Sequence, residues 1–209
     1  MEWKLRLVLF GVIQVTREGS PVDLPYRKSV ALLSYLASTG RPHSREALSA
    51  LLWGESNEDR ARASLRTALW HLNEPLEPFL IVDRQSVAFD QDSPHWVDVV
   101  EFRESIEGVR QATRGHVGKE DSPPLTDRQA AVLDDAVELY RGEFMAGFAV
   151  RNAPNFEDWM LRKREWCRDL AVRARYRLVA YHKVKGQYRE GLDSAAQLLV
   201  IAPWQEEAH

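Results

Sequence analysis

The sequence predicts a mainly α-helical protein with a small β component, in which a winged helix-turn-helix is followed by an all-helical domain. Residues 1–96 read, in order, as strands, three compact helices and a hairpin. Two helices joined by a short turn and followed by a hairpin have the order of a winged helix-turn-helix. From residue 97 onward the patterns indicate only helices and loops. We therefore expect two domains, residues 1–96 and residues 97–209.

The chain begins with β patterns. Residues 5–15 alternate loosely and are rich in β-branched and aromatic side chains, which predicts one strand. The segment "REGSP" predicts a turn, and "VDL" at residues 22–24 predicts a short returning strand.

Three helices follow, each bounded by ordinary stop and start signals. The first is expected over residues 27–38 and ends at Gly40. Ser44 can cap the second, which runs to about Trp53. Ser56 and Asp59 have capping-box spacing before the third, which is expected to end near Pro75. "FLIVDRQSVAFD" then predicts a hairpin with Arg84 at its tip.

The second part of the chain has helical periodicity throughout. Thr126 and Gln129 form a second predicted capping box, and Asn155 is expected to cap a long helix. Trp159 and Trp166, seven residues apart in that helix, are interpreted as core residues. Four helices are expected, at about residues 97–115, 126–140, 156–184 and 188–202. The final "WQEEAH" stops in mid-pattern, which suggests that the chain is a fragment of a longer protein.

Composition excludes several classes of protein. The chain has 28 Lys and Arg against 31 Asp and Glu, so a generally basic nucleic-acid coat is excluded. Cys167, the only cysteine, is expected to be a small buried hydrophobe, and neither an internal disulfide nor a zinc site needing two cysteines is possible. No apolar run approaches the roughly 20 residues of a membrane span. We expect a cytoplasmic protein that contacts no membrane.

The sequence contains none of the catalytic or metal-binding motifs that we searched for. The sequence has no metalloprotease, nucleophile-elbow, phosphate-loop or calcium-loop pattern, and its six histidines provide no i, i+4 pair. We expect no enzyme activity, no catalytic residue, no metal and no cofactor.

The third predicted helix carries an arginine-rich face. "RARASLRTALWHLNEPL" puts its apolar residues on one arc of about 100°, and no acidic residue occurs between Arg60 and Leu72. Small residues near the start of a helix let it enter a DNA major groove, where arginine can bind guanine or phosphate. The candidate DNA-reading residues are Arg60, Arg62, Ala63, Ser64, Arg66, Thr67, Trp70 and His71. The alternative is a solvated amphipathic helix whose arginines only maintain solubility.

Four other basic residues and one serine lie at positions from which they could contact DNA phosphates or the neighbouring groove. Helix N-termini bind phosphate, so cations at the first turns of two helices fit an anionic partner. The hairpin tip can reach a minor groove or the backbone. These candidates are Arg27, Lys28, Ser44, Arg45 and Arg84. Residues 1–96 hold 11 Lys and Arg against 12 Asp and Glu, 11 − 12 = −1, so affinity would rest on placement and on paired sites.

"LLWGESNEDRARASLRTALWHL" resembles the helix-turn-helix core of the Streptomyces antibiotic regulatory protein (SARP) type of transcriptional activator, whose winged domain is similar to that of OmpR. "WVDVVEF", "YRGEFMAGF" and "FEDWMLRKREW" resemble the family's bacterial transcriptional activation domain. "GQYREGLDSAAQLLVIAPWQEEAH" resembles a tetratricopeptide unit, with Gly191 where alanine is usual.

The resemblance implies an activator that binds double-stranded DNA as a homodimer on direct repeats and contacts RNA polymerase. It also implies a tetratricopeptide-like second domain. One departure is that Leu72 is followed by Asn73-Glu74-Pro75, where family members usually have arginine. The alternative function is a protein-interaction adaptor whose winged domain no longer binds DNA.

Overall fold

The structure is a computed structural model, and it describes residues 4–113 and 124–201. The described residues of Met1–Asp98 and Phe144–Lys163 form one compact unit, and those of Val99–Glu143 and Arg164–His209 form a second. The first unit thus takes twenty residues from far along the chain. No helix within the described ranges combines the length and apolar content that crossing a membrane requires. The predicted end of the chain in mid-pattern, at residues 204–209, lies outside the described residues.

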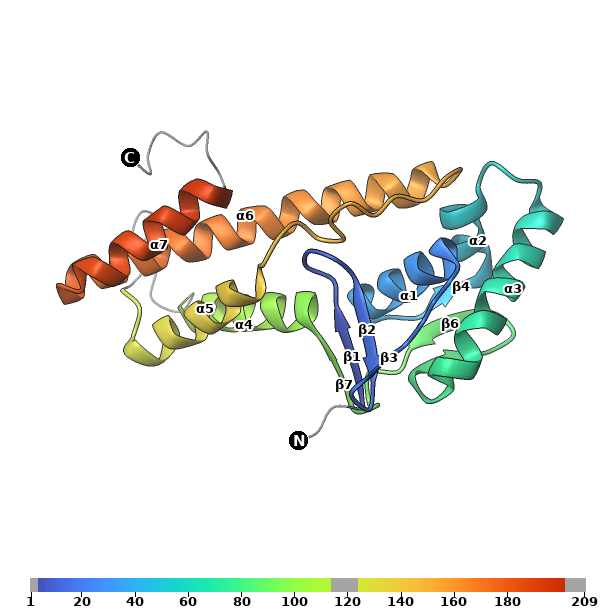
Figure 1. Cartoon of the computed structure of the whole chain (residues 1–209), viewed down its shortest axis with the longest axis horizontal. Coiled ribbons are helices and arrows are strands. Elements are labelled where there is room, and N and C mark those ends of the chain that lie inside the picture. The colour runs from blue at the N-terminus through green and yellow to red at the C-terminus, as the bar shows by residue number, and fades with distance from the viewer. Residues whose placement is uncertain (1–3, 114–123, 202–209) are drawn as a thin grey trace. The chain divides into compact units, whose positions relative to one another are not determined.

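The predicted fold class is confirmed, because a winged helix-turn-helix precedes a helical unit (Figure 1). The elements up to residue 97 are β1 (Leu5–Val8), β2 (Gln14–Arg17), β3 (Ser20–Pro21), α1 (Arg27–Thr39), β4 (His43–Ser44), α2 (Arg45–Trp53), α3 (Glu58–Leu76), a 3-10 turn (Glu77–Phe79), β5 (Leu80–Val82), β6 (Ser86–Phe89) and β7 (His95–Val97). The later elements are α4 (Asp98–Thr113), α5 (Asp127–Leu139), α6 (Pro154–Lys185) and α7 (Tyr188–Ile201).

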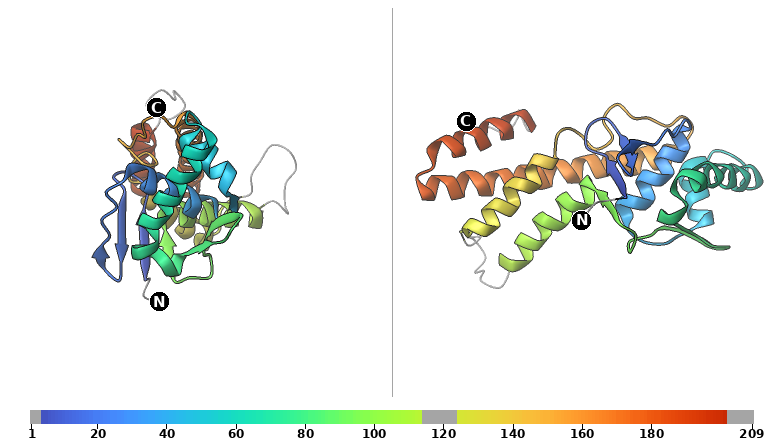
Figure 2. Two further views of the ribbon diagram at one scale, coloured as in Figure 1. Left: turned by 90° about the vertical axis from the view of Figure 1, so that its right-hand side faces the viewer. Right: turned by 60° about the horizontal axis from the view of Figure 1, so that its bottom comes forward.

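The first unit contains two small sheets. In the four-stranded sheet the order is β3-β2-β1-β7, with β1 and β7 parallel and the other pairs antiparallel. The three-stranded sheet has the order β4-β6-β5. The predicted hairpin is confirmed as β5 and β6, which follow α3 (Figure 2). This hairpin is the wing.

The prediction of a single strand over residues 5–15 is wrong. The chain forms two antiparallel strands there, and the connection between them contains Gly11 with φ 79°. The returning strand is Ser20–Pro21 rather than residues 22–24, because Glu18 and Gly19 turn the chain earlier, at φ 50° and 80°. β7 was not predicted, since its three residues pair with a strand about ninety positions earlier.

The N-terminal helix caps agree with the sequence at two positions and differ at two. The Ser44 side chain accepts from Ala47 N at 3.1 Å, and the Thr126–Gln129 capping box is present. The predicted Ser56–Asp59 box is wrong, because Asn57 caps α3 and accepts from Arg60 N. The predicted Asn155 cap is also wrong, because α6 already begins at Pro154. α3 continues through Pro75 to Leu76, although Pro75 was expected to be its limit.

Residues 144–163, which we call the anchored segment, pack against the N-terminal part of the first unit. Met145 N donates to Leu9 O at 2.6 Å, Phe10 and Phe144 form an antiparallel bridge, and Phe144 and Phe156 are fully buried. Trp159 and Trp166, predicted as core residues, are both half-buried, and Trp159 packs with its ring centroid 4.8 Å from that of Tyr35. Residues 144–163 are therefore part of the winged unit.

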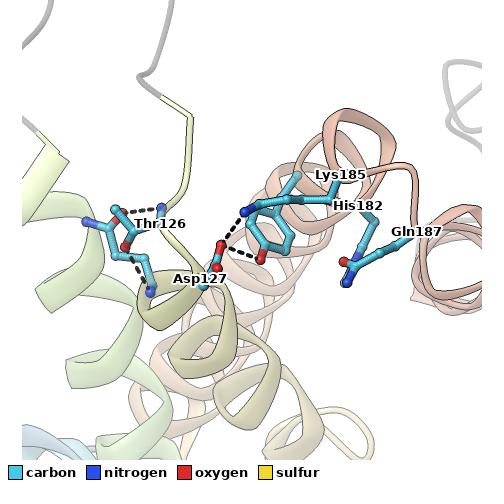
Figure 3. A network of polar contacts seen from close by, with 7 residues as sticks. Thr126, Asp127, His182, Lys185 and Gln187 are labelled. Atoms are coloured by element: carbon cyan, nitrogen blue, oxygen red, sulfur yellow. Dashed lines mark hydrogen bonds and ion pairs between the residues drawn. The ribbon is translucent and has the colours of Figure 1, made fainter.

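In the second unit, polar contacts join α5 to the end of α6 (Figure 3). Asp127 accepts from Tyr181 Oη at 2.9 Å and pairs with Lys185 Nζ at 2.6 Å. Gly186, at φ 72°, ends α6 and lets α7 fold back so that Leu198 packs on Val172. Cys167 is fully buried, as predicted.

Candidate nucleic-acid interface

α3 has one buried face and one exposed face, as its sequence predicts. The six residues expected to face inward are all buried, and they are Ala61, Leu65, Ala68, Leu69, Leu72 and Leu76. Among the candidate DNA-reading residues, Ser64 and His71 are half-buried and the other six are exposed. Trp70 is the largest exposed side chain of this face, at 69%. A 19-residue helix spans about 28 Å, which is enough to cross a major groove.

Some candidates on α3 already contact the protein itself. Arg62 forms an exposed ion pair with Glu58, one turn before it. Thr67 Oγ1 donates to Ala63 O at 3.2 Å, which leaves the threonine methyl free to contact a partner. His71 stacks on Tyr26 with ring centroids 4.1 Å apart. Arg66 makes no hydrogen bond or ion pair with any residue that the structure describes.

α3 is flanked on one side by a groove that we call the wing groove. It has a volume of about 560 Å³ and lies between the start of α2, α3 and the wing. Five candidate residues gather around it, and they are Ser44, Arg45, Arg62, Arg66 and Arg84. Glu46 is the one carboxylate among its described lining residues. Four guanidinium groups around one groove give a local positive potential in a chain of negative net charge.

Hydrogen bonds fix the wing against the start of α2. Arg45 Nε donates to Asp83 O at 2.9 Å, and Arg45 N donates to Gln85 O at 2.9 Å. The Asp83 carboxylate accepts from Ser86 Oγ, Ser86 N and Gln85 N, and these bonds, with the Arg45 charge, hold its pKa below the usual 3.8. These bonds hold the wing turn in place, and Arg84 at its tip lines the wing groove.

Arg27 and Lys28 lie apart from this groove. Arg27 Nε donates to Ala149 O at 2.8 Å, and Lys28 Nζ donates to Leu52 O at 2.6 Å and to Asn152 O at 3.3 Å. Arg27 also lies 4.9 Å from the centre of the Phe148 ring. Both cations therefore help to hold residues 148–152 on the winged unit, a role that the sequence analysis missed.

Two further residues, Gln85 and Arg151, lie beside α3 although the sequence analysis did not select them. Gln85 lines the wing groove beside Arg84, and Arg151 lies with Arg27 and Lys28 on the other side of α3. Gln85 follows a predicted tip residue, so the hairpin prediction contained a signal for it. Arg151 is about eighty residues from α3 in sequence, and no local pattern indicates its position.

Residues 97–209 match the family described as bacterial transcriptional activator domain. A solved structure of Mycobacterium tuberculosis EmbR, in complex with a low-affinity phosphopeptide, matches with a TM-score of 0.59 and 18% identity. The match covers 95% of this chain and 60% of the EmbR chain, so it supports the fold. A search of curated protein sequences found no match. The activator domain that the SARP resemblance implies is thereby confirmed.

Proposed function

The chain belongs to the bacterial transcriptional activator domain family, a family of transcription regulators, and we propose that it regulates transcription by binding specific DNA sequences through α3 and the wing. The observation that carries this proposal is the wing groove. Three successive parts of the fold, α2, α3 and the wing, bring Arg45, Arg66 and Arg84 to one groove beside the exposed face of α3. Guanidinium groups beside an exposed helix fit a duplex whose backbone is anionic and whose base edges accept hydrogen bonds.

In this proposal α3 enters the major groove. Arg60, Ala63, Thr67 and Trp70 face the bases, and Ser64 and His71 lie at the edge of that face. Arg66 reads a base from the edge of this face, and the other arginines of the wing groove, Arg45, Arg62 and Arg84, bind the phosphates of one strand. Ser44 presents the N-terminus of α2 to the same strand. Arg27 and Lys28 act by positioning residues 148–152, and they reach DNA only through their remaining donors.

The wider functional proposal follows the family resemblance. The protein would activate promoters with direct-repeat sites as a homodimer on DNA and contact RNA polymerase, acting in the cytoplasm and without enzymatic activity. The chain spans 60% of the EmbR chain that it matches, so these statements about the whole protein are proposals. The alternative function, an adaptor that binds no DNA, is favoured by Asn73 and Glu74, which are exposed at the end of α3.

The test is to incubate the purified chain with sheared genomic DNA from its source and to sequence the bound fragments. Enrichment of a few intergenic fragments sharing a direct repeat supports the proposal. Affinity for such a fragment is then measured against salt concentration. If Arg45, Arg62 and Arg84 each neutralise one phosphate, log K falls with log salt at a slope of about −3. A flat enrichment profile from folded protein at low salt would instead favour the adaptor.

The variant Arg84→Glu tests whether the wing groove contacts DNA. Its side chain is exposed at the wing tip, so folding is preserved, while a carboxylate replaces a phosphate-binding group. We expect weaker binding to every DNA sequence and a smaller salt slope. Arg173→Glu, on the exposed surface of α6, is the matched control. Equal losses from both variants would show that only net charge matters and would contradict the assignment to the wing groove.

A further inference from the structure

A second groove, which we call the α1 groove, lies on the other side of α3 from the wing groove, and its α3 wall includes residues proposed to face the bases. Its volume is about 910 Å³, within the range typical of small-molecule sites. It is formed by the start of α1, the end of α2, α3 and the loop before α6, all within the first unit. Its α3 wall consists of Ala63, Ser64, Thr67, Ala68 and His71.

The walls of the α1 groove suit a flat aromatic molecule. Tyr26 and His71 are stacked at 4.1 Å with an interplanar angle of 28°, so together they present an ordered aromatic surface. Trp53 and Val150 add apolar surface from two other elements. The α3 wall has only small side chains between these groups, which leaves room for a ring system. Stacking on aromatic side chains is a common way to bind planar ligands.

The charge of the α1 groove has one sign. Arg27, Lys28 and Arg151 line it, and no carboxylate occurs among its described lining residues. The carbonyl groups of Ala149 and Leu52 hold Arg27 and Lys28 in place, which reduces the entropy lost when they bind an anion. Burial lowers the pKa of Lys28, and Glu55 opposes this effect more weakly. A bound anion would favour the charged form of this amine.

We propose that the α1 groove binds a small planar aromatic carboxylate, with its rings beside Tyr26 and His71 and its carboxylate near Arg151 and Lys28. The ligand would cover Ala63, Ser64 and Thr67, which are three of the candidate DNA-reading residues. Ligand and DNA therefore compete for the same face of α3, and this part rests on the proposed function. A metabolite of this chemical class would therefore displace the regulator from DNA.

The test uses 2-naphthoate as the probe and 2-naphthamide as a matched uncharged control. Amide signals of the ¹⁵N-labelled full chain are followed by NMR during titration. We expect saturable shifts at Ala63, Ser64, Thr67 and Val150, with a dissociation constant on the order of 1 mM for so small a ligand. The uncharged amide should bind about tenfold more weakly, because it loses the interaction with the cations.

Two exposed arginines provide matched variants. Arg151→Glu should weaken naphthoate binding by about tenfold or more, whereas Arg84→Glu, in the wing groove, should leave it unchanged. Circular dichroism confirms that both variants are folded. Shifts centred elsewhere, equal binding of the amide, or equal effects of the two variants would overturn the site.

Competition with DNA is measured separately. If the chain binds DNA, naphthoate should raise the apparent dissociation constant for DNA in proportion to its own occupancy. Naphthoate binding to the α1 groove without this effect would overturn the proposed competition. If the chain binds no DNA, the shifts and the Arg151→Glu variant still decide whether the ligand site exists, so failure of the proposed function and failure of this site are distinguishable.

Discussion

Arg27 donates from Nε to the carbonyl oxygen of Ala149 at 2.8 Å, although the two residues are 122 positions apart in the sequence. The bond connects the first turn of α1 to a loop within the segment that matches the activator domain. The boundary between the two compact units therefore differs from the boundary of the family match. Residues 144–163 complete the winged unit, and they also form one wall of the α1 groove.

The first prediction concerns base recognition by Arg66. Its side chain is exposed, and it is free of ion pairs with the residues that the structure describes. Arg66→Ala should lower the affinity for the specific site by about 1–3 kcal/mol and relax the sequence preference at one position. Titration of labelled DNA by fluorescence anisotropy measures both effects. Arg173→Ala is the control, and a mutant indistinguishable from it would exclude Arg66 from the reading face.

The second prediction concerns the anchored segment. Phe156 is fully buried in the winged unit although it belongs to α6. Phe156→Ala should lower the free energy of unfolding by about 3–5 kcal/mol and should increase hydrogen exchange at the amides of α1. Leu161→Ala, on a side chain that is 55% exposed, should change stability by less than about 0.5 kcal/mol. Unchanged exchange in α1 would contradict the assignment of this segment to the first unit.

The third prediction concerns the buried carboxylate of Asp98. It accepts from Leu9 N and from Phe10 N at 2.9 Å, and the residue is only 2% exposed. Asp98→Ala would leave two buried N–H groups without an acceptor, so we expect a loss of about 2–4 kcal/mol in chemical denaturation. Asp92→Ala, at an exposed position, is the matched control. Equal stability of the two variants would show that water replaces the carboxylate.

The fourth prediction concerns the pH dependence of stability. Burial lowers the pKa of His43 below its usual 6.5, and the charge of Arg41 acts in the same direction. The unfolded chain then binds a proton at a higher pH than the folded chain does. Stability from this residue is therefore fully present above pH 6.5 and is lost as the pH falls from there through the folded pKa.

The measurement for His43 is urea denaturation at several pH values between about 5 and 8. His43→Gln should reduce the loss of stability on acidification, whereas His182→Gln, in the second unit, should retain it. The effect is local, because His43 Nε2 lies 2.8 Å from Thr39 Oγ1 and its ring lies 4.7 Å from that of Tyr35. An unchanged pH profile in His43→Gln would contradict the prediction.

Local sequence determined most of the helical part of the winged unit. The buried face of α3 is predictable because a 3.6-residue period with six small or aliphatic residues has only one apolar side. The Ser44 cap and the Thr126–Gln129 box are predictable because each bond joins residues three positions apart. The same local signals selected Ser44, Arg45, Arg66 and Arg84 as candidates, although their common groove was not visible from sequence.

Tertiary structure decided the features that depend on contacts distant in sequence. β7 pairs with β1, and Phe144 and Phe156 pack into a unit that begins more than one hundred residues earlier. Asn155 illustrates the difference, because its predicted role was a local cap, whereas its side chain donates to Ala50 O at 2.9 Å. Arg27 and Lys28 were likewise predicted to bind DNA phosphates from local position alone. In the structure they donate hydrogen bonds to the carbonyl groups of residues 149 and 152. A periodic pattern specifies which face of an element is buried, and only the packing of the whole chain specifies what covers that face.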